Sequence, residues 1–128
     1  MLNPKYSKGI QELESQGHTA FKVFGGSMTP IIKSGSLLYF EKAEDYEVGD
    51  IVFCRVHGRI IDAHLITQKC QKRGYLISNN HGHDNGWTHR IFGKVIKIEE
   101  MAKSNGLVGI AKQAKKDRKE LSKQILEN

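Results

Sequence analysis

The chain has 128 residues, enough for one domain with a modest core. Hydrophobic residues make up 38% and charged residues 27%, which excludes a disordered or fibrous protein. The formal net charge is +6, but residues 101–128 hold seven basic and three acidic residues, so most of the excess lies at the end of the chain. The basic excess therefore indicates where a partner or a surface docks. It does not indicate the function of residues 1–100, which are close to neutral.

Membrane and secretory signatures are absent from the sequence. No apolar run approaches the roughly 18 residues that cross a bilayer, and residues 1–20 lack the apolar stretch of a secretory signal. Two cysteines, Cys54 and Cys70, cannot form a disulfide framework or complete a structural zinc site. We therefore expect a soluble cytoplasmic protein in a reducing compartment, with both thiols buried or idle, or one that is peripheral at a membrane.

The first predicted element is a short helix over residues 3–17. Asn3 can cap its beginning and Gly17 ends it. Ile10 and Leu13 form a thin apolar stripe, so we expect this helix to lie on the body of the protein.

Alternating, β-branched or aromatic runs next predict five or six short strands separated by turn-forming residues. Strands at this spacing indicate a mainly β fold, either a coiled antiparallel sheet or a partial barrel. The polar stretch over residues 79–86 is expected to be a turn. The expected strands are residues 21–24, 37–42, 51–56, 59–67, 74–78 and 91–98.

A basic amphipathic helix is predicted at the end of the chain. Apolar residues recur there at helical spacing, and lysines fill the other face. We expect this helix to dock with its lysines solvated, or to contact an acidic partner, an anionic membrane surface or nucleic acid. The chain thus divides into an N-terminal helix (1–20), a β domain (21–100) and the basic helix (101–128), whose apolar residues are Leu107, Ile110, Ala111, Ala114, Leu121 and Ile125.

The most informative motif is Phe24-Gly25-Gly26-Ser27-Met28-Thr29-Pro30. Two glycines before a serine permit unusual backbone angles and leave the serine hydroxyl exposed at a turn. Taken alone, such a Gly-Gly-Ser is more often an ordinary loop than the site of a nucleophile.

Further short motifs follow this one along the chain. They are Ser34-Gly35-Ser36-Leu37-Leu38, Val48-Gly49-Asp50-Ile51-Val52, Ile61-Asp62-Ala63-His64-Leu65, Tyr75-Leu76-Ile77-Ser78-Asn79-Asn80 and Phe92-Gly93-Lys94-Val95. This order resembles the clan that unites type I signal peptidases with the self-cleaving domains of SOS-type repressors and their phage relatives. The resemblance covers roughly residues 21–100 and implies the β fold of that clan.

The resemblance also implies a nucleophile and a general base. In the clan the nucleophile is the serine before the methionine, which is Ser27 here. The base is usually a lysine, and His64 stands at that position. The archaeal and endoplasmic-reticulum signal peptidases use a histidine there, so a serine–histidine site is implied. A histidine with a pKa near ~6.5 is substantially neutral at physiological pH and can accept the serine proton.

An acidic residue that orients the histidine is expected by the logic of catalytic triads. Asp84, in the polar stretch, is the candidate for this role. Asp62 is nearer to His64 in sequence, but two residues apart on one strand it shares a face without being well placed to orient the ring.

Gly25, Gly26 and Met28 are the residues expected around the oxyanion or the substrate. Gly25 stands where signal peptidases often carry a hydroxyl residue that helps to bind the oxyanion. The oxyanion would therefore rest on backbone donors such as the amide of Ser27.

Blander interpretations apply to the remaining polar and aromatic residues. A metal cluster could be formed by His81, His83, Asp84 and His89. No thiol or second spaced motif joins these residues, so we expect neither a metal nor a cofactor. Trp87 is interpreted as packing, because stacking on a nucleobase needs interleaved basic residues.

We predict a serine endopeptidase-like domain in which Ser27 and His64 cleave a peptide bond of a protein or peptide substrate. The alternative is a catalytically inactive peptidase-fold module, a phage or bacterial regulatory protein that grips a protein or nucleic-acid partner. Residues 1–20 are too short for the helix-turn-helix domain of a repressor, and no transmembrane anchor is present. We therefore expect a free-standing minimal domain.

Overall fold

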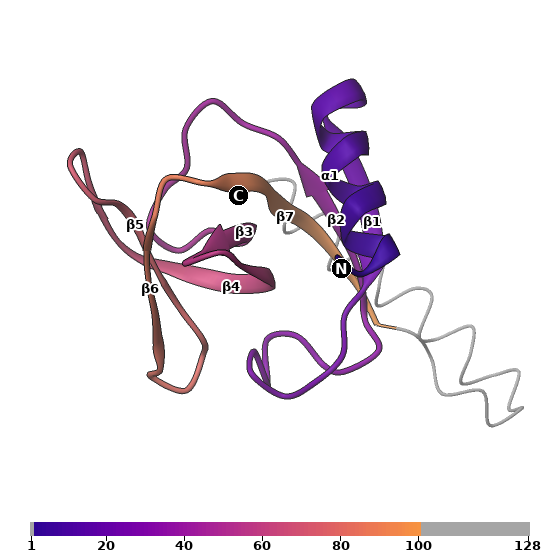
Figure 1. Ribbon diagram of the computed structural model, residues 1–128. Coiled ribbons are helices and arrows are strands. Elements are labelled where there is room, and N and C mark those ends of the chain that lie inside the picture. Colours follow the sequence, from indigo (N-terminus) through magenta and orange to yellow (C-terminus); the bar gives the residue numbers. More distant parts are fainter. Residues whose placement is uncertain (1, 101–128) are drawn as a thin grey trace, which may run out of the picture.

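The computed structural model describes residues 2–100, and the structural statements below concern these residues. The predicted basic helix over 101–128, with its expected docking partners, lies outside the described residues. Figure 1 shows a helix, α1 (Pro4–Gln16), packed beside a curved β-sheet. No helix within residues 2–100 is both long enough and apolar enough to cross a membrane.

Helix α1 begins and ends where local chemistry predicts. The Asn3 side chain accepts a hydrogen bond from the main-chain N–H of Lys5 over 3.0 Å, and the N–H of Gly17 bonds back to the last turn with a φ of 84°. Leu13 is buried in the core, so the helix is an integral part of the domain.

Seven strands follow α1 and form one sheet. Each neighbouring pair is antiparallel, in the order β1-β2-β7-β3-β4-β5-β6. Within residues 2–100 no ladder joins β1 to β6, so the sheet is coiled but open, which confirms the predicted mainly β class. The strands are β1 (His18–Lys22), β2 (Leu37–Glu41), β3 (Ile51–Val56), β4 (Arg59–Cys70), β5 (Gly74–Ser78), β6 (Asp84–Thr88) and β7 (Ile91–Glu99).

Three strand predictions need correction, and one of them is β4, which was predicted to end at residue 67 and ends at Cys70. Strand β1 begins at His18, three residues before the predicted start, because Thr19 is buried and donates its hydroxyl proton to Glu12 of α1. Strand β6 occupies part of the stretch predicted as a turn. Its residues, Asp84–Thr88, are largely polar and carry no hydrophobic alternation, so pairing with β5 defines the strand.

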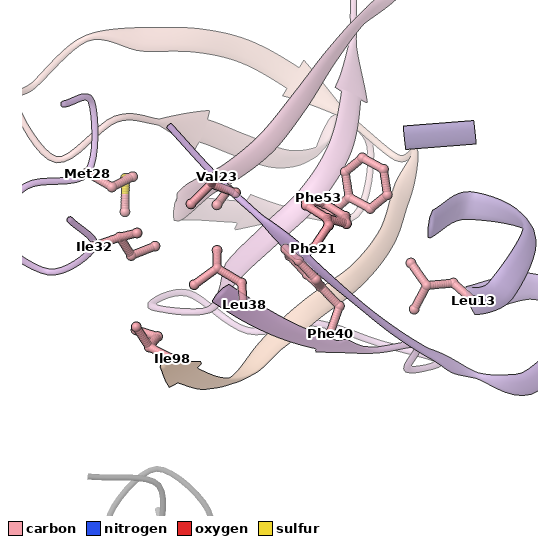
Figure 2. Packing of buried hydrophobic residues seen from close by; sticks show 10 residues of the cluster. Leu13, Phe21, Val23, Met28, Ile32, Leu38, Phe40, Phe53 and Ile98 are labelled. Carbon is pink, nitrogen blue, oxygen red and sulfur yellow. The ribbon is translucent and has the colours of Figure 1, made fainter. Parts of the chain in front are cut away.

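The main core lies between α1, β1, β2, β3, β4 and β7, and Figure 2 shows its two parts. One part is aromatic, with the Phe21 ring 4.7 Å from Phe40 and 5.1 Å from Phe53 between centroids. The other part lies beneath the loop that joins β1 to β2 and includes Met28 and Ile32 of that loop.

A second cluster of buried residues lies on strands β3, β4 and β5, with Tyr46 from the preceding loop. It contains Cys54, whose thiol pKa burial raises to about 12, so this cysteine is unreactive at neutral pH. Cys70 is exposed, and its sulfur accepts a hydrogen bond from the main-chain N–H of Arg73. Both cysteines are free thiols.

Candidate active site

Ser27 lies in the loop that joins β1 to β2, which we call the serine loop (residues 23–36). Backbone hydrogen bonds close its base, from the Val23 N–H to the Ser36 oxygen and from the Gly35 N–H to the Val23 oxygen. Met28 is only 3% exposed and belongs to the main core, so the residue after Ser27 anchors the turn. Gly25 has a φ of 104°, a conformation that a side chain would strain.

A second loop, residues 79–83 between β5 and β6, is bonded to the serine loop. The main-chain N–H of Asn80 donates to the oxygen of Ser27 over 2.9 Å, and its side-chain amide donates to the oxygen of Thr29 over 2.9 Å. The His81 Nε2 nitrogen donates to the oxygen of Gly26 over 3.0 Å. Both loops lie at the lower edge of the molecule in Figure 1 and form one hydrogen-bonded unit.

His64 reaches Ser27 from strand β4. Its neighbour Ala63 is buried in the main core, so this part of the strand is anchored to the same core as the serine loop. The Nε2 nitrogen of His64 lies 3.1 Å from the Ser27 Oγ oxygen, within hydrogen-bond range. The two candidate residues, 37 positions apart in the chain, are thus in contact.

The electrostatic surroundings keep His64 uncharged at neutral pH. Burial is the largest cause and lowers the imidazole pKa below its usual 6.5. A hydrogen bond to Asn85 and the negative charge of Asp62 oppose the shift, whereas the charge of His83 adds to it. A neutral imidazole next to a serine hydroxyl can accept its proton.

Asn85, and not Asp84, contacts the other nitrogen of His64. The Asn85 Oδ1 oxygen lies 2.9 Å from Nδ1. Asp84 instead accepts a hydrogen bond of 2.6 Å from the Ser78 hydroxyl, which also bonds to Thr67 over 2.8 Å. The expectation that Asp84 orients the ring is therefore corrected.

A shift of register between β5 and β6 explains why Asn85, and not Asp84, contacts His64. Ile77 pairs with Gly86, but Ser78 pairs with Asp84, so Asn85 is an extra residue in β6. Such a β-bulge redirects the side chain at the inserted position. The sequence contained no signal for the bulge, although an asparagine can serve as the third member of a catalytic triad.

Asp62 acts on the site from a distance. Its carboxylate accepts a hydrogen bond of 3.0 Å from the Tyr6 hydroxyl of α1. Burial, followed by the negative charge of Asp62, raises the pKa of Tyr6 to about 12, so this hydroxyl remains a donor. Asp62 thus influences His64 through its charge, whereas the Nδ1 nitrogen of His64 donates its hydrogen bond to Asn85.

Backbone N–H groups around Ser27 are candidate donors for an oxyanion. The N–H of Gly25 is already bonded to the Ser34 hydroxyl over 3.0 Å, so Gly25 does not offer this donor. Gly26 contributes its carbonyl to the contacts with Thr29 and His81. Among residues 2–100, no acceptor bonds the N–H of Ser27 itself.

A small hollow adjoins the Ser27 hydroxyl. Most of the residues that line it are apolar, and Asp62 is the charged residue among them. The side chains that form its apolar floor are buried in the main core. The lining residues are Val23, Phe24, Gly25, Ser27, Met28, Ile32, Asp62 and Ala63.

His81 and His89, two members of the suggested metal cluster, contact different parts of the molecule. His81 bonds to the serine loop, whereas the Nε2 nitrogen of His89 bonds to the oxygen of Lys72. In the described part of the chain, no three His, Cys, Asp or Glu side chains gather as a metal site would require. Trp87 lies under the Arg73 guanidinium, 5.8 Å from the ring centre, which is a cation–π contact.

Comparison with known protein families gives a match over most of the chain. A family model described as Peptidase S24-like matches residues 4–96, from the first residue of α1 into β7. The matched region includes Ser27, His64 and Asn85. No curated protein gives a significant match to the chain.

Proposed function

This chain belongs to the Peptidase S24-like family, and on that premise we propose that it is a serine endopeptidase with Ser27 as nucleophile and His64 as general base. Family membership agrees with the clan resemblance of the sequence motifs. The observation that supports the catalytic roles is the 3.1 Å separation between the Ser27 Oγ and His64 Nε2 atoms.

In the proposed acylation step, Ser27 Oγ attacks the carbonyl carbon of the scissile peptide bond. Its proton passes to His64 Nε2, and the C–O bond forms as the carbonyl oxygen becomes an oxyanion. The N–H of Ser27 is the donor we assign to that oxyanion. His64 then gives the proton to the leaving amine, and the C–N bond breaks to leave an acyl-enzyme.

Hydrolysis of the acyl-enzyme uses the same histidine. Water loses a proton to His64 Nε2 and attacks the ester carbon, and the proton returns to Ser27 Oγ as the ester bond breaks. Histidine suits both steps because its pKa lies below the neutral range, so it is recovered in the basic form after each turnover.

The hollow beside Ser27 supports a peptide substrate with a small apolar side chain at the cleavage position. Met28, Ile32 and Ala63 limit its depth, because they are packed in the core and cannot move aside without cost. We therefore propose that alanine or glycine is accepted there and that an aromatic side chain is excluded.

Labelling with a fluorophosphonate probe at about pH 8 tests the proposal, since the probe reacts with an activated serine. Mass spectrometry of the wild type is expected to find the label on Ser27. Ser27→Ala abolishes labelling and His64→Ala slows it at least ~100-fold, the usual contribution of a general base. His18→Ala, an exposed histidine on β1, is the matched control and labels normally.

The same experiment contradicts the proposal if the folded wild type is not labelled. That outcome favours the alternative, a non-catalytic module of the peptidase fold that binds a partner.

A further inference from the structure

Asn85 contacts the one ring nitrogen of His64 that faces away from Ser27. The contacting atom is the carbonyl oxygen Oδ1, at 2.9 Å from Nδ1, and a carbonyl oxygen can only accept a hydrogen bond. Nδ1 must therefore carry the proton. In a neutral ring, this leaves Nε2 with a lone pair, directed at the Ser27 hydroxyl 3.1 Å away.

We propose that Asn85 is a positioning residue that holds His64 in the tautomer protonated at Nδ1, and that it does so with an uncharged side chain where a triad would carry a carboxylate. The inference rests on the proposed function for its catalytic consequence. The tautomer itself is a property of the resting protein.

The backbone of β6 is built to present this side chain. Asn85 is the extra residue of the β-bulge, and the next residue, Gly86, has a φ of 131°. A Cβ atom on Gly86 would lie 2.7 Å from His57 Nε2 and 3.1 Å from a Val56 methyl group. A side chain at this position would therefore require the His57 ring to shift and would strain the backbone, so glycine suits the residue that follows the bulge.

The charged groups around His64 do not substitute for Asn85. Asp62, on the same strand, is bonded to Tyr6 of α1. Asp84 is bonded to Ser78, and His83 acts on the ring in the opposite sense, because its charge lowers the pKa of His64. Within residues 2–100, the Asn85 amide is thus the only hydrogen-bond partner of Nδ1, and this partner is uncharged.

Nitrogen-15 NMR of the imidazole ring, with the full-length chain, tests the inference without reference to activity. Wild-type protein above neutral pH is expected to show a protonated Nδ1 and an unprotonated Nε2 for His64. Asn85→Ala shifts the ring toward the Nε2-protonated form, and Asn85→Asp, which keeps an acceptor in place, retains the Nδ1 proton.

Asn85→Asp has a second expected effect, because the new carboxylate stabilises the imidazolium: the His64 pKa rises measurably above the wild-type value. Asp84→Asn is the matched control, since it removes a charge at the residue next to Asn85 that bonds Ser78 and not His64. It should leave the tautomer of His64 unchanged. Exchanging both residues, Asp84→Asn with Asn85→Asp, tests the position of the charge at constant net charge.

The two proposals fail separately. If the Nδ1 proton persists in folded Asn85→Ala, or if Asp84→Asn moves it, Asn85 does not position the ring, whatever the probe labels. If the tautomer follows Asn85 as expected but the wild type is not labelled by the fluorophosphonate, the positioning stands and the hydrolytic function fails. Asn85→Asp keeps the test decisive if Asn85→Ala does not fold.

Discussion

The main-chain N–H of Asn80 donates a hydrogen bond of 2.9 Å to the carbonyl oxygen of Ser27. This contact joins two segments that are 53 residues apart, and the Asn80 side chain adds a second bond to the oxygen of Thr29. The position of the Ser27 hydroxyl therefore depends on the loop after β5 as well as on the core beneath Met28.

Asn80→Ala is expected to loosen this connection. The variant loses the part-buried bond to Thr29, at a cost of about 1 kcal/mol in the free energy of unfolding. The labelling rate of Ser27 should fall as well, since a displaced hydroxyl no longer meets His64. Urea denaturation and probe kinetics measure the two effects.

Gln68→Ala is the control for Asn80→Ala, because Gln68 is an exposed amide on β4 with no side-chain hydrogen bond in the described structure. Gln68→Ala is expected to change neither the free energy of unfolding nor the labelling rate of Ser27. Equal effects of the two substitutions would show that the Asn80 bond does not hold the serine loop.

The pH profile of labelling follows from the low pKa of His64. Protonation of Nε2 removes the lone pair that accepts the serine proton, so the rate falls as the pH falls. Because burial lowers the pKa below 6.5, the midpoint of this decline should lie below pH 6.5. An acid limb centred above 6.5 would contradict the assignment of His64 as a buried base.

Stability provides a control on the same histidine. The unfolded chain binds a proton near pH 6.5, whereas the folded chain does so only at lower pH, so the free energy of unfolding falls as the pH drops through this window. His64→Ala should lose this part of the pH dependence, and His18→Ala should retain it. Urea denaturation at several pH values separates this effect from a change in the rate of labelling.

Two buried serines should respond in opposite ways to substitution by alanine. Ser36 is 1% exposed and its hydroxyl has no partner within residues 2–100, whereas the Ser78 hydroxyl, 2% exposed, is bonded to Thr67 and Asp84. Ser36→Ala is expected to raise the free energy of unfolding by up to about 1 kcal/mol, because it removes an unsatisfied polar group.

Ser78→Ala is expected to lower the free energy of unfolding by about 1–3 kcal/mol, since it leaves Asp84 without its 2.6 Å hydrogen-bond partner. Urea denaturation midpoints of the two variants give the comparison. Equal destabilisation by both substitutions would mean that the Ser36 hydroxyl is satisfied in solution.

The features predicted correctly from the sequence are those with a local chemical cause. Helix α1 has a capping asparagine and a terminal glycine, so its limits follow from its own residues. Strand β3 matches its prediction because it is a run of buried apolar residues. Ser27 and His64 were implied as a pair by the resemblance to the peptidase clan, and the fold brings Ser27 Oγ and His64 Nε2 to 3.1 Å.

The features that were missed depend on contacts between distant segments. Strand β6 is polar and is defined by its ladder with β5, which no periodicity of its own residues reveals. The exchange of Asp84 for Asn85 results from a one-residue shift in that ladder. A bulge depends on the partner strand, so residue types alone favoured the carboxylate that a triad usually contains.

Gly86→Ala is expected to disrupt both the fold of β6 and the orientation of His64. The substitution places a Cβ atom 2.7 Å from His57 Nε2 in a backbone conformation with a φ of 131°, and the backbone strain alone costs about 1–3 kcal/mol. If β6 moves away to relieve the contact, Asn85 moves with it. The labelling rate of Ser27 should therefore fall further than the loss of stability explains.

Gly82→Ala is the matched control for Gly86→Ala. Gly82 also has a positive φ, 87°, but its Cβ atom would meet no atom within 4 Å. It should lose about 1 kcal/mol of stability from backbone strain and retain the Nδ1-protonated tautomer of His64. Urea denaturation, probe kinetics and nitrogen-15 NMR distinguish the two variants. Loss of the tautomer in Gly82→Ala, or its retention in folded Gly86→Ala, would show that close approach of β6 to His57 does not control Asn85.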